Sequence, residues 1–437
     1  MIDINTLRDN PDKLKEGVAA KGYDTTLVDK ALEADKKYRE LLQKVENLRA
    51  ERNKVAKEKN IEVGKKIKEE LKNLDPELSK LEEEYFNSIK EIPNVPSDDT
   101  PRGKDEDENK VVRSWSPSQE SSADRRETPK KFDFEPKDHM ELGKALGIID
   151  TDTSAVVSGT RFNYLKGDAV LLQFALIQFA LETLGNREKV SEIARTVDNS
   201  IDTPFVPVVP PVLMKTSVMG KMDRLNPRDE RYILEKDDLA LVGSAEHTLG
   251  PMHMDTTFSE KDLPKRYVGY STAFRREAGT YGKDTTGILR VHQFDKLEME
   301  SFSAPELGEK EHYLMTAIQE YFMQKLEIPY QVIAICTGDM GKPNYKQTDI
   351  NCWIPSQKKY RETHTADFMT DYQARRLNTR VQKKDKTEFV HMNDATAFAI
   401  GRTLIAILEN FQQKDGSVVV PDVLRKWVGK EKLTREG

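Results

Sequence analysis

Charged residues that could bind a ligand gather in one stretch of the chain, from Tyr267 to Ser303. Both ends of this stretch alternate apolar and polar residues, which predicts two paired strands, and the glycines between Glu277 and Gly287 predict a joining loop. The paired strands would place basic and acidic side chains on neighbouring rungs: Arg275, Arg276, Glu277, Arg290, Lys296 and Glu298. Such alternating charge suits a polyanionic ligand that also carries an amine. The alternative is a surface hairpin with solvated charges, the common outcome for charged hairpins in general.

Two further stretches contain residue types that bind metal and phosphate. Residues Tyr360 to Arg376 read YRETHTADFMTDYQARR and include Glu362 and Thr365, whose oxygens suit a hard divalent cation. Taken alone, one carboxylate and one hydroxyl are weak support for a metal site. Arg402 opens a predicted helix in AIGRTLIAILEN, and taken alone it would be an ordinary surface arginine. The GDMGK segment at 338–342 lacks the spacing and the Ser or Thr of a P-loop, so that motif is rejected.

The composition narrows the class and the location of the protein. The 437 residues are 37% hydrophobic and 33% charged, with a mean hydropathy of -0.69, so we expect a soluble protein of two or three domains. A net charge of -6 does not indicate a nucleic-acid binder, so local clusters of basic residues matter more. We expect neither a signal peptide nor a membrane span, because no apolar segment is long enough. Cys336 and Cys352 lack CxxC spacing and no HExxH pattern occurs, so we expect no zinc site and predict a cytoplasmic location.

The N-terminal part carries the most regular hydrophobic pattern. Two segments follow alternating three- and four-residue spacing: Tyr38, Leu41, Val45, Leu48, Arg52 and Val55, then Ile67, Leu71, Leu74, Leu78, Leu81 and Tyr85. The interruption near Asn60 to Gly64 predicts an antiparallel coiled-coil hairpin, each arm about 45 Å long for roughly 30 residues. Pro76 lies inside the second segment and predicts a kink or a local break. A short helix from about Ile4 to Ala20 is expected before the hairpin.

The predicted hairpin tip is basic. Between Arg49 and Lys72 there are nine Lys or Arg residues against five Glu. Such a tip can bind phosphate backbones electrostatically. The candidate residues for this contact are Arg49, Arg52, Lys54, Lys57, Lys65, Lys66 and Lys68. An ordinary solvated coiled coil or a dimerisation rod would have a similar sequence, so the pattern alone leaves these alternatives open.

The rest of the chain reads as a linker followed by an α+β domain. Residues 93–137 are rich in Pro, Asp and Ser, which predicts a linker that is partly mobile around Ser116 to Thr128. After it we predict helices at 168–184, 311–327 and the end of 389–412, and strands near 205–214, 239–249, 330–336, 349–354 and the start of 389–412. Strands outnumber what a parallel βαβ scheme would give. We therefore predict an antiparallel sheet flanked by helices, with the helical arm at its N-terminus.

These motifs resemble those of the seryl-tRNA synthetases, which belong to the class II aminoacyl-tRNA synthetases. FRREAG followed by RVHQFDKLE resembles motif 2, AIGRTLIAILEN followed by FQQKDGSVVVPDVL resembles motif 3, and FVPVVPPVLM stands where motif 1 would be. The passage EIPNVP…GKDEDEN is similar to the segment that joins the arm to the catalytic domain in that family. The resemblance implies a tRNA-binding arm at 1–92, a linker at 93–137 and a class II catalytic domain at 138–437.

The resemblance also implies an ATP site. Arg275 would bind the α-phosphate and the substrate carboxylate, Glu277 would meet the adenine side, and Phe294 would stack on the base. Arg290 would approach the terminal phosphates, and Arg402 would neutralise the γ-phosphate. The matching stretches add Arg276, Val291, Thr363 and His364, together with the pair that would hold Mg²⁺, Glu362 and Thr365.

A serine pocket is implied by the same resemblance. Its residues would be Ser244, Ala245, Glu246, Arg275, Glu298 and Thr396. Glu246 would accept the substrate ammonium and Glu298 its hydroxyl. Because a buried polar group left unpaired is costly, such a pocket would disfavour alanine.

Several positions depart from the family pattern. Ser244 stands where Thr is usual, Asp394 where Asn is usual, and Thr396 where Ser is common, yet each keeps an oxygen that can form hydrogen bonds. Asp394 also adds a carboxyl group near the pocket. After Asp349, Asn351 and Cys352 stand where the family usually has a Glu and an apolar residue.

The family resemblance implies a homodimer that activates L-serine with ATP and Mg²⁺ and transfers it to the 3′ end of tRNA(Ser). Two alternatives stay open at this point. A synthetase-like ligase that loads a carrier protein would share the catalytic motifs but would have no use for the basic arm. A non-catalytic RNA-binding relative would keep the arm, but the presence of Arg275, Glu298, Glu362 and Arg402 argues against it.

Overall fold

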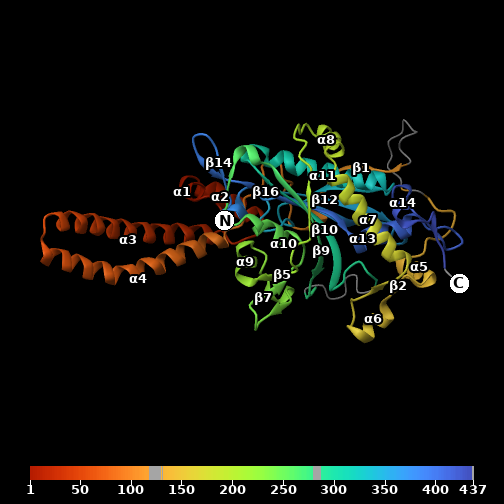
Figure 1. Ribbon diagram of the computed structural model, residues 1–437, viewed down its shortest axis with the longest axis horizontal. Helices are drawn as coiled ribbons and strands as arrows, with labels where there is room; N and C mark the ends of the chain where they lie inside the picture. The colour runs from red at the N-terminus through yellow and green to blue at the C-terminus, as the bar shows by residue number, and fades with distance from the viewer. Residues whose placement is uncertain (118–128, 130, 279–286, 436–437) are drawn as a thin grey trace.

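The computed structural model describes residues 1–117, 129, 131–278 and 287–435 (Figure 1). Within these residues the largest sheet consists of β1 (Lys110–Trp115), β4 (Val206–Val208), β9 (Lys265–Phe274), β10 (Gln293–Ser303), β11 (Tyr330–Ala334), β12 (Lys346–Ile354), β13 (Lys359–Phe368) and β16 (His391–Ala399). The strand order is β1-β11-β12-β13-β16-β10-β9-β4. All neighbours are antiparallel except β4, which runs parallel to β9 at one edge. The predicted α+β class with a largely antiparallel sheet is confirmed.

Three helices pack against one face of this sheet and enclose the main core (Figure 1). They are α7 (Asp168–Leu184), α11 (Gly308–Lys325) and α13 (Ile400–Asn410). Successive residues of β10 point to opposite faces, as in any strand. Leu297 and Met299 therefore lie in the core, whereas Lys296 and Glu298 point to the other face. That other face carries the candidate site.

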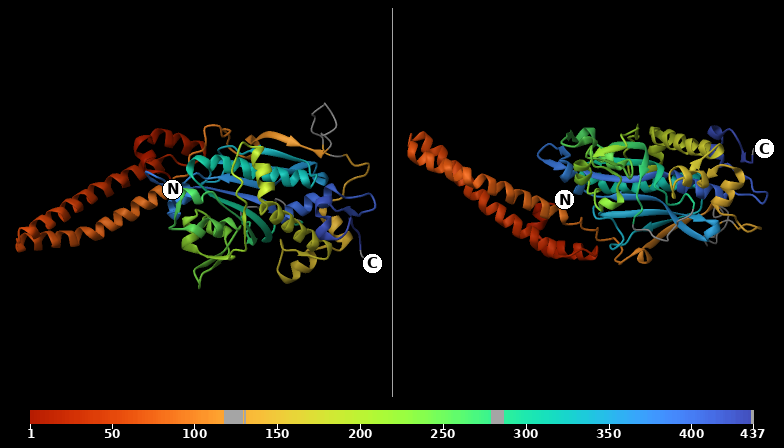
Figure 2. Two further views of the ribbon diagram at one scale, coloured as in Figure 1. Left: turned by 45° about the horizontal axis from the view of Figure 1, so that its top comes forward. Right: turned by 90° about the horizontal axis from the view of Figure 1, so that it is seen from below.

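The arm is a long helical hairpin that projects away from the sheet (Figures 1 and 2). It consists of α3 (Thr26–Lys57) and α4 (Ile61–Glu91), so the predicted interruption near Asn60 is confirmed. The buried residues of its seam are Val45, Val55, Ile67 and Leu71, with Leu41, Leu48, Leu74 and Leu78 partly buried beside them. Tyr38 stacks on Tyr85 with ring centroids 5.2 Å apart. Arg52, which was counted in the predicted seam, is exposed instead.

The base of the arm is fixed by buried charges. α1 (Ile4–Asp9) is held to α3 because Asp35 is buried and binds both Arg8 and Arg39, at 2.6 and 2.9 Å. The ammonium of Lys21 donates to the backbone carbonyls of Gly341 and Asn344 in the sheet domain. Burial lowers the pKa of Lys21 to about 7. The arm therefore joins the sheet domain through polar contacts in addition to apolar packing.

Two predictions for the N-terminal helices are wrong in detail. The single helix expected from Ile4 to Ala20 is divided into α1 and α2 (Pro11–Ala20), because Pro11 suits the first position of a helix and cannot continue the preceding one. At Pro76, where a kink or a local break was expected, the break is absent because α4 is one continuous helix among the described residues, and the kink stays a prediction. Pro76 is exposed, so water can bond the carbonyl that loses its helical partner.

The predicted linker also contains a strand that the sequence analysis did not find. β1 lies inside residues 93–137 and pairs with β11 at the edge of the sheet. Trp115 at its end stacks on Tyr330, with ring centroids 5.7 Å apart. The part predicted to be mobile runs from Ser116 to Thr128: Ser116 is buried, and residues 118–128 lie outside the described residues. The domain boundaries remain a prediction.

The second strand of the predicted hairpin begins at Gln293, later than the alternation from Ile288 indicated. His292 instead donates its backbone N–H to the carbonyl of Arg161, at 2.9 Å. Ile288 and Val291 are both buried. Four consecutive residues, Ile288 to Val291, line the cavity, so the alternating pattern does not mark a strand there.

Shorter elements complete the described chain. Its further helices are α5 (His139–Leu146), α6 (Thr151–Val157), α8 (Arg187–Arg195), α9 (Thr216–Lys221), α10 (Glu246–Leu249), α12 (Tyr372–Leu377) and α14 (Arg425–Val428). Two small sheets have three strands each. In one, β7 (Leu239–Leu241) lies between β5 (Leu213–Lys215) and β6 (Ile233–Leu234), and in the other, β14 (Arg380–Gln382) lies between β8 (Thr257–Ser259) and β15 (Thr387–Phe389). Two further sheets have two strands each: β2 (Ile149–Asp150) with β3 (Tyr164–Leu165), and β17 (Val418–Val419) with β18 (Lys432–Leu433). No single helix in the described part is long and apolar enough to cross a membrane, although α7 and α8 pass that test as a pair bent by 77°.

Candidate active site

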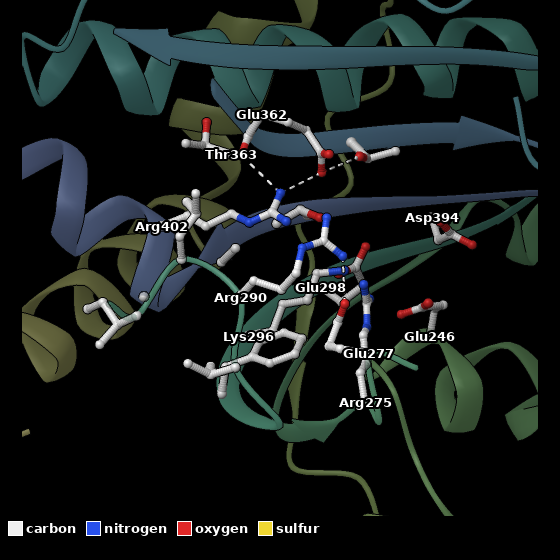
Figure 3. Close-up of a pocket in the computed structure, with 18 of the residues that line it drawn as sticks. Glu246, Arg275, Glu277, Arg290, Lys296, Glu298, Glu362, Thr363, Asp394 and Arg402 are labelled. Carbon is white, nitrogen blue, oxygen red and sulfur yellow. Dashed lines mark hydrogen bonds and ion pairs between the residues drawn. The ribbon is translucent and has the colours of Figure 1, made fainter. Parts of the chain in front are cut away.

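A cavity of about 200 Å³ opens on the sheet face opposite α7 and α11 (Figure 3). Strands β10, β13 and β16 supply its floor, and the segments after β9 and at the start of α13 supply its walls. Most of the residues proposed from the sequence line it: Glu246, Arg275, Glu277, Arg290, Val291, Phe294, Glu298, Glu362, Thr363, Thr365, Thr396 and Arg402. Segments that are far apart in the sequence thus meet in one cavity.

Three arginines gather at one end of this cavity. Arg402, near the start of α13, forms an ion pair with Glu362 at 2.8 Å. Arg290 pairs with Glu277 at 2.6 Å. Arg275 follows the end of β9, and in Figure 3 its side chain lies close to those of Arg290 and Glu277. Such a cluster of guanidinium groups can neutralise a polyphosphate.

Phe294 provides an aromatic surface beside the arginines. The guanidinium carbon of Arg275 lies 5.4 Å from the centroid of the Phe294 ring. The Nε of Arg275 donates to the backbone carbonyl of Gly243 at 3.1 Å, which fixes the orientation of the arginine side chain. A flat base could stack on the ring while the guanidinium contacts an anion nearby.

The oxygen pair at Glu362 and Thr365 fits a shared metal ion. The Thr365 hydroxyl lies 3.5 Å from the Glu362 carboxylate. Burial opposes ionisation of Glu362, but the positive charges of Arg402 and Arg275 outweigh it and lower the pKa of this carboxyl. In the described part of the chain, no group of three or more His, Cys, Asp or Glu side chains could hold a metal alone. A cation here would need ligand oxygens from the substrate as well.

The opposite end of the cavity carries carboxylates with one lysine among them. Lys296 lies 2.5 Å from Glu298, which is only 2% exposed. Burial and the nearby charge of Glu246 raise the pKa of Glu298 to about 7. Glu246 behaves in the opposite way, because the positive charges of Lys296 and Arg224 outweigh burial and lower its pKa well below the ordinary value. An ionised Glu246 suits an ammonium, and Glu298 suits a neutral hydroxyl.

Ser244 and Ala245 support this end of the cavity without lining it. The Ser244 hydroxyl lies 3.0 Å from the Lys296 ammonium and 3.3 Å from a Glu298 oxygen. Ala245 is fully buried at the start of α10. Gly269 of β9 permits this packing, because a Cβ there would lie 3.2 Å from that of Ala245.

Two residues proposed for the ATP site also lie away from the cavity wall. Arg276 donates to the carbonyl of Arg231 and stacks over Tyr232 at 4.8 Å. His364 is buried on the core side of β13, with its ring 6.0 Å from Phe398. Burial lowers the pKa of His364 to about 3, so its ring is neutral.

Three residues at the carboxylate end were not predicted from the sequence. Arg224 and Asp367 line the cavity. Asp367 lies inside the stretch from Tyr360 to Arg376 but was not proposed as a site residue, and Arg224 lies in no stretch that the sequence marked. His247 accepts a hydrogen bond from the Gly243 backbone N–H at 3.1 Å, which closes the turn that carries Glu246. Its position directly after Glu246 was the available signal.

Comparisons with known proteins agree with this geometry. Residues 1–96 match the model of the seryl-tRNA synthetase N-terminal domain, and residues 231–411 match that of the tRNA synthetase class II core domain (G, H, P, S and T). The chain is 38% identical to the serine–tRNA ligase of Dictyoglomus turgidum, with 98% of each chain covered, and 39% identical to that of Thermobifida fusca, with 99% of each covered.

Solved structures give the same result. The seryl-tRNA synthetase of Pyrococcus horikoshii complexed with ATP is 36% identical, with a TM-score of 0.89 and 100% of both chains covered. The cytoplasmic serine–tRNA ligase of Naegleria fowleri in complex with AMP is 30% identical, with a TM-score of 0.86 over 100% of this chain and 99% of that one. Full-length similarity in both sequence and structure leads to one conclusion: the chain belongs to the seryl-tRNA synthetase family.

Proposed function

We propose that the protein activates L-serine with ATP and transfers the seryl group to the 3′ end of tRNA(Ser). The observation that carries this proposal is the polarity of the cavity. One end holds the arginines and Phe294, and the other holds Glu246, Glu298 and Thr396. A polyphosphate nucleotide and a small hydroxylated amino acid can therefore bind end to end. Arg275, which lies between Glu246 and Arg290 in Figure 3, would contact both ligands.

The first step joins the serine carboxylate to the α-phosphorus of ATP. Glu246 holds the ammonium, while Glu298 and Thr396 bind the hydroxyl, so the carboxylate is directed toward Arg275. A carboxylate oxygen attacks the α-phosphorus, the bond to the β-phosphate oxygen breaks, and pyrophosphate leaves. Arg275 binds the carboxylate and the α-phosphate together, and Arg290 and Arg402 neutralise the leaving pyrophosphate. Positioning and charge neutralisation supply most of the catalysis.

Glu362 and Thr365 are the residues that would hold Mg²⁺ with the phosphates. A bound Mg²⁺ would neutralise phosphate charge and fix the shape of the polyphosphate. The ionised state of Glu362 and the oxygen-only character of this pair fit that cation. Arg402 would keep the Glu362 carboxylate oriented through its ion pair.

In the second step a ribose hydroxyl at the tRNA 3′ end attacks the serine carbonyl carbon, and AMP leaves. We propose that the arm holds the tRNA during this step. All seven candidate residues of the arm are exposed, and they lie on the halves of α3 and α4 that are farthest from the sheet domain (Figure 2). Their positive charges would meet phosphate groups of the long variable region.

We also propose that two copies of the chain associate through the edge at β4. Val206 and Val209 beside this edge are 54% and 82% exposed. Apolar side chains gathered at an open sheet edge are typical of an interface.

Cys336 and Cys352 are both free and buried, which agrees with a reducing compartment, and we place the protein in the cytoplasm.

The test is ATP–pyrophosphate exchange with serine, threonine, alanine and glycine, followed by charging of tRNA(Ser). Exchange that serine drives most strongly, together with charging, would support the proposal. Exchange without tRNA binding would favour a ligase that loads a carrier protein. Binding of tRNA without exchange would favour a non-catalytic relative.

A further inference from the structure

Arg224 lies in the carboxylate end of the cavity and forms ion pairs with two aspartates. Its guanidinium is 3.5 Å from Asp394 on β16 and 3.7 Å from Asp367 on β13. These two aspartates are direct partners across the antiparallel ladder, so their side chains leave the same face of the sheet side by side. Arg224, Asp394 and Asp367 all line the cavity.

Arg224, Asp394 and Asp367 lie at the end of the cavity opposite the arginines that we assign to the phosphates. In Figure 3, Asp394 and Glu246 lie on one side of the cavity, and Arg402 lies on the other. An amino acid whose carboxylate reaches Arg275 would direct its ammonium and side chain toward Asp394 and Glu246. The side chain would then face the Arg224 ion pairs.

The carboxylates need Arg224 because they are crowded and buried. Asp394 is 5% exposed and Asp367 is 7% exposed, with Glu246 and Glu298 in the same cavity. Burial and repulsion from Asp367 raise the pKa of Asp394 well above its ordinary value, and Arg224 opposes that shift. Without the guanidinium, both aspartates would lose the positive partner that they share in the buried cavity.

Arg224 is also held in position from outside the cavity. Arg231 donates to the backbone carbonyl of Arg224 at 2.7 Å. The preceding residue, Asp223, accepts a hydrogen bond from the hydroxyl of Tyr372 at 3.0 Å and pairs with Arg376 at 3.3 Å. The guanidinium is therefore a fixed part of the cavity floor.

We propose that Arg224, paired with Asp394, is a specificity-determining residue that closes the cavity behind a small hydroxylated amino acid, an inference that rests on the proposed function. The ion pair occupies the space that a longer or branched side chain would need. It also fixes the position of the Asp394 carboxyl group at the end of the cavity where the side chain of the amino acid would lie.

A double-mutant cycle tests this proposal by ATP–pyrophosphate exchange. The variants are Arg224→Gln, Asp394→Asn and the double substitution, with the KM values for serine and for ATP measured separately. We expect each single change to raise the serine KM by about tenfold or more, because it removes one member of a buried group of ion pairs. The double variant should recover much of that loss, while the KM for ATP stays within about twofold throughout.

Selectivity gives a second measurement. Arg224→Ala should lower the ratio of kcat/KM for serine over threonine by about tenfold, because removal of the guanidinium opens the floor to an extra methyl group. Arg224→Lys, which keeps the positive charge, should lie between this variant and the wild type. The matched control is Arg228→Gln, since Arg228 is a nearby arginine whose partner, Glu235, is 79% exposed at its side chain. It should behave as wild type.

Three results would overturn the proposal. They are additive losses in the double variant, equal changes in the serine and ATP constants, and an unchanged serine-to-threonine ratio in Arg224→Ala. Thermal unfolding identifies a variant that fails to fold. In that case the two single variants Arg224→Lys and Asp394→Asn are compared with the wild type instead. Absence of serine-dependent exchange in the wild type would instead overturn the proposed function itself.

Discussion

Replacing Glu298 by glutamine removes the group that we assign to the substrate hydroxyl while keeping its shape. Glu298 lies on β10, is 2% exposed, and contacts Lys296 at 2.5 Å and the Ser244 hydroxyl at 3.3 Å. The amide of Glu298→Gln can still accept one hydrogen bond from its neighbours, but it carries no charge. The substitution therefore separates the charge of the carboxylate from its volume.

The expected effect follows from the strength of hydrogen bonds to charged groups. Such bonds contribute about 1.5–3 kcal/mol, which corresponds to a loss of about 10- to 100-fold in kcat/KM for serine. Alanine has no hydroxyl, so its much lower activity should change little. The ratio of kcat/KM for serine over alanine should fall by the same factor of about 10 to 100.

The assay is ATP–pyrophosphate exchange with each amino acid, and Glu300→Gln is the matched control. Glu300 lies on the same strand two residues further along, is fully buried, and does not line the cavity. Burial, with repulsion from Asp394, raises its pKa well above the ordinary value, so an uncharged amide should replace it without effect on serine. An unchanged serine-to-alanine ratio in Glu298→Gln, or an equal fall in Glu300→Gln, would refute the reasoning.

The same variant has a predictable dependence of stability on pH. The pKa of Glu298 is raised from 4.5 to about 7 in the folded protein, mainly by burial, so the folded state binds this proton more tightly than the unfolded state. The wild type should therefore lose stability relative to Glu298→Gln as the pH rises from about 4.5 to 7, and the difference should be constant above that window. Thermal unfolding of both proteins between pH 5 and 8 measures it. A difference that grows in favour of the wild type with rising pH would contradict the assignment.

Three further predictions concern other parts of the molecule. Lys65→Ser with Lys66→Ser should weaken tRNA binding and reduce its salt dependence by about two units of slope, with exchange activity unchanged, as filter binding at several salt concentrations would measure. Arg402→Ala should raise the KM for ATP by about tenfold or more and leave the KM for serine nearly unchanged, because a charged contact to phosphate is lost. Arg266→Met should lower the free energy of unfolding in urea by about 3–5 kcal/mol, since it leaves the carboxylate of Glu311 buried without its bidentate partner.

The sequence predicted those parts of the site whose residues stand close together in a short stretch. Arg275 and Glu277 are separated by one residue, and Glu362 and Thr365 by two, so a single strand or loop brings each pair to the same place. Hydrophobic spacing also predicted the arm well, because a two-helix seam depends mainly on residues within each helix.

The cavity floor could not be predicted in the same way. Arg224 comes from an irregular segment, and it meets Asp394 and Asp367 only because β13 and β16 pair in one particular register. A shift of either strand by one residue would turn its aspartate toward the helices and separate the pair. The sequence marked Asp394 as unusual, but its counter-ion was invisible without the fold.

The contacts around Asp223 connect this floor to the base of the arm. The Tyr372 hydroxyl lies 3.0 Å from an Asp223 carboxylate oxygen and 3.0 Å from the carbonyl of Ile92 at the end of α4, and it can donate to either. The Arg376 guanidinium forms an ion pair with Asp223 and also donates to the backbone carbonyl of Lys90. Because these two side chains hold both the end of the arm and the segment that carries Arg224, a displaced arm would move the cavity floor as well. The arm should therefore be regarded as a structural support of the amino-acid site in addition to its proposed contact with tRNA.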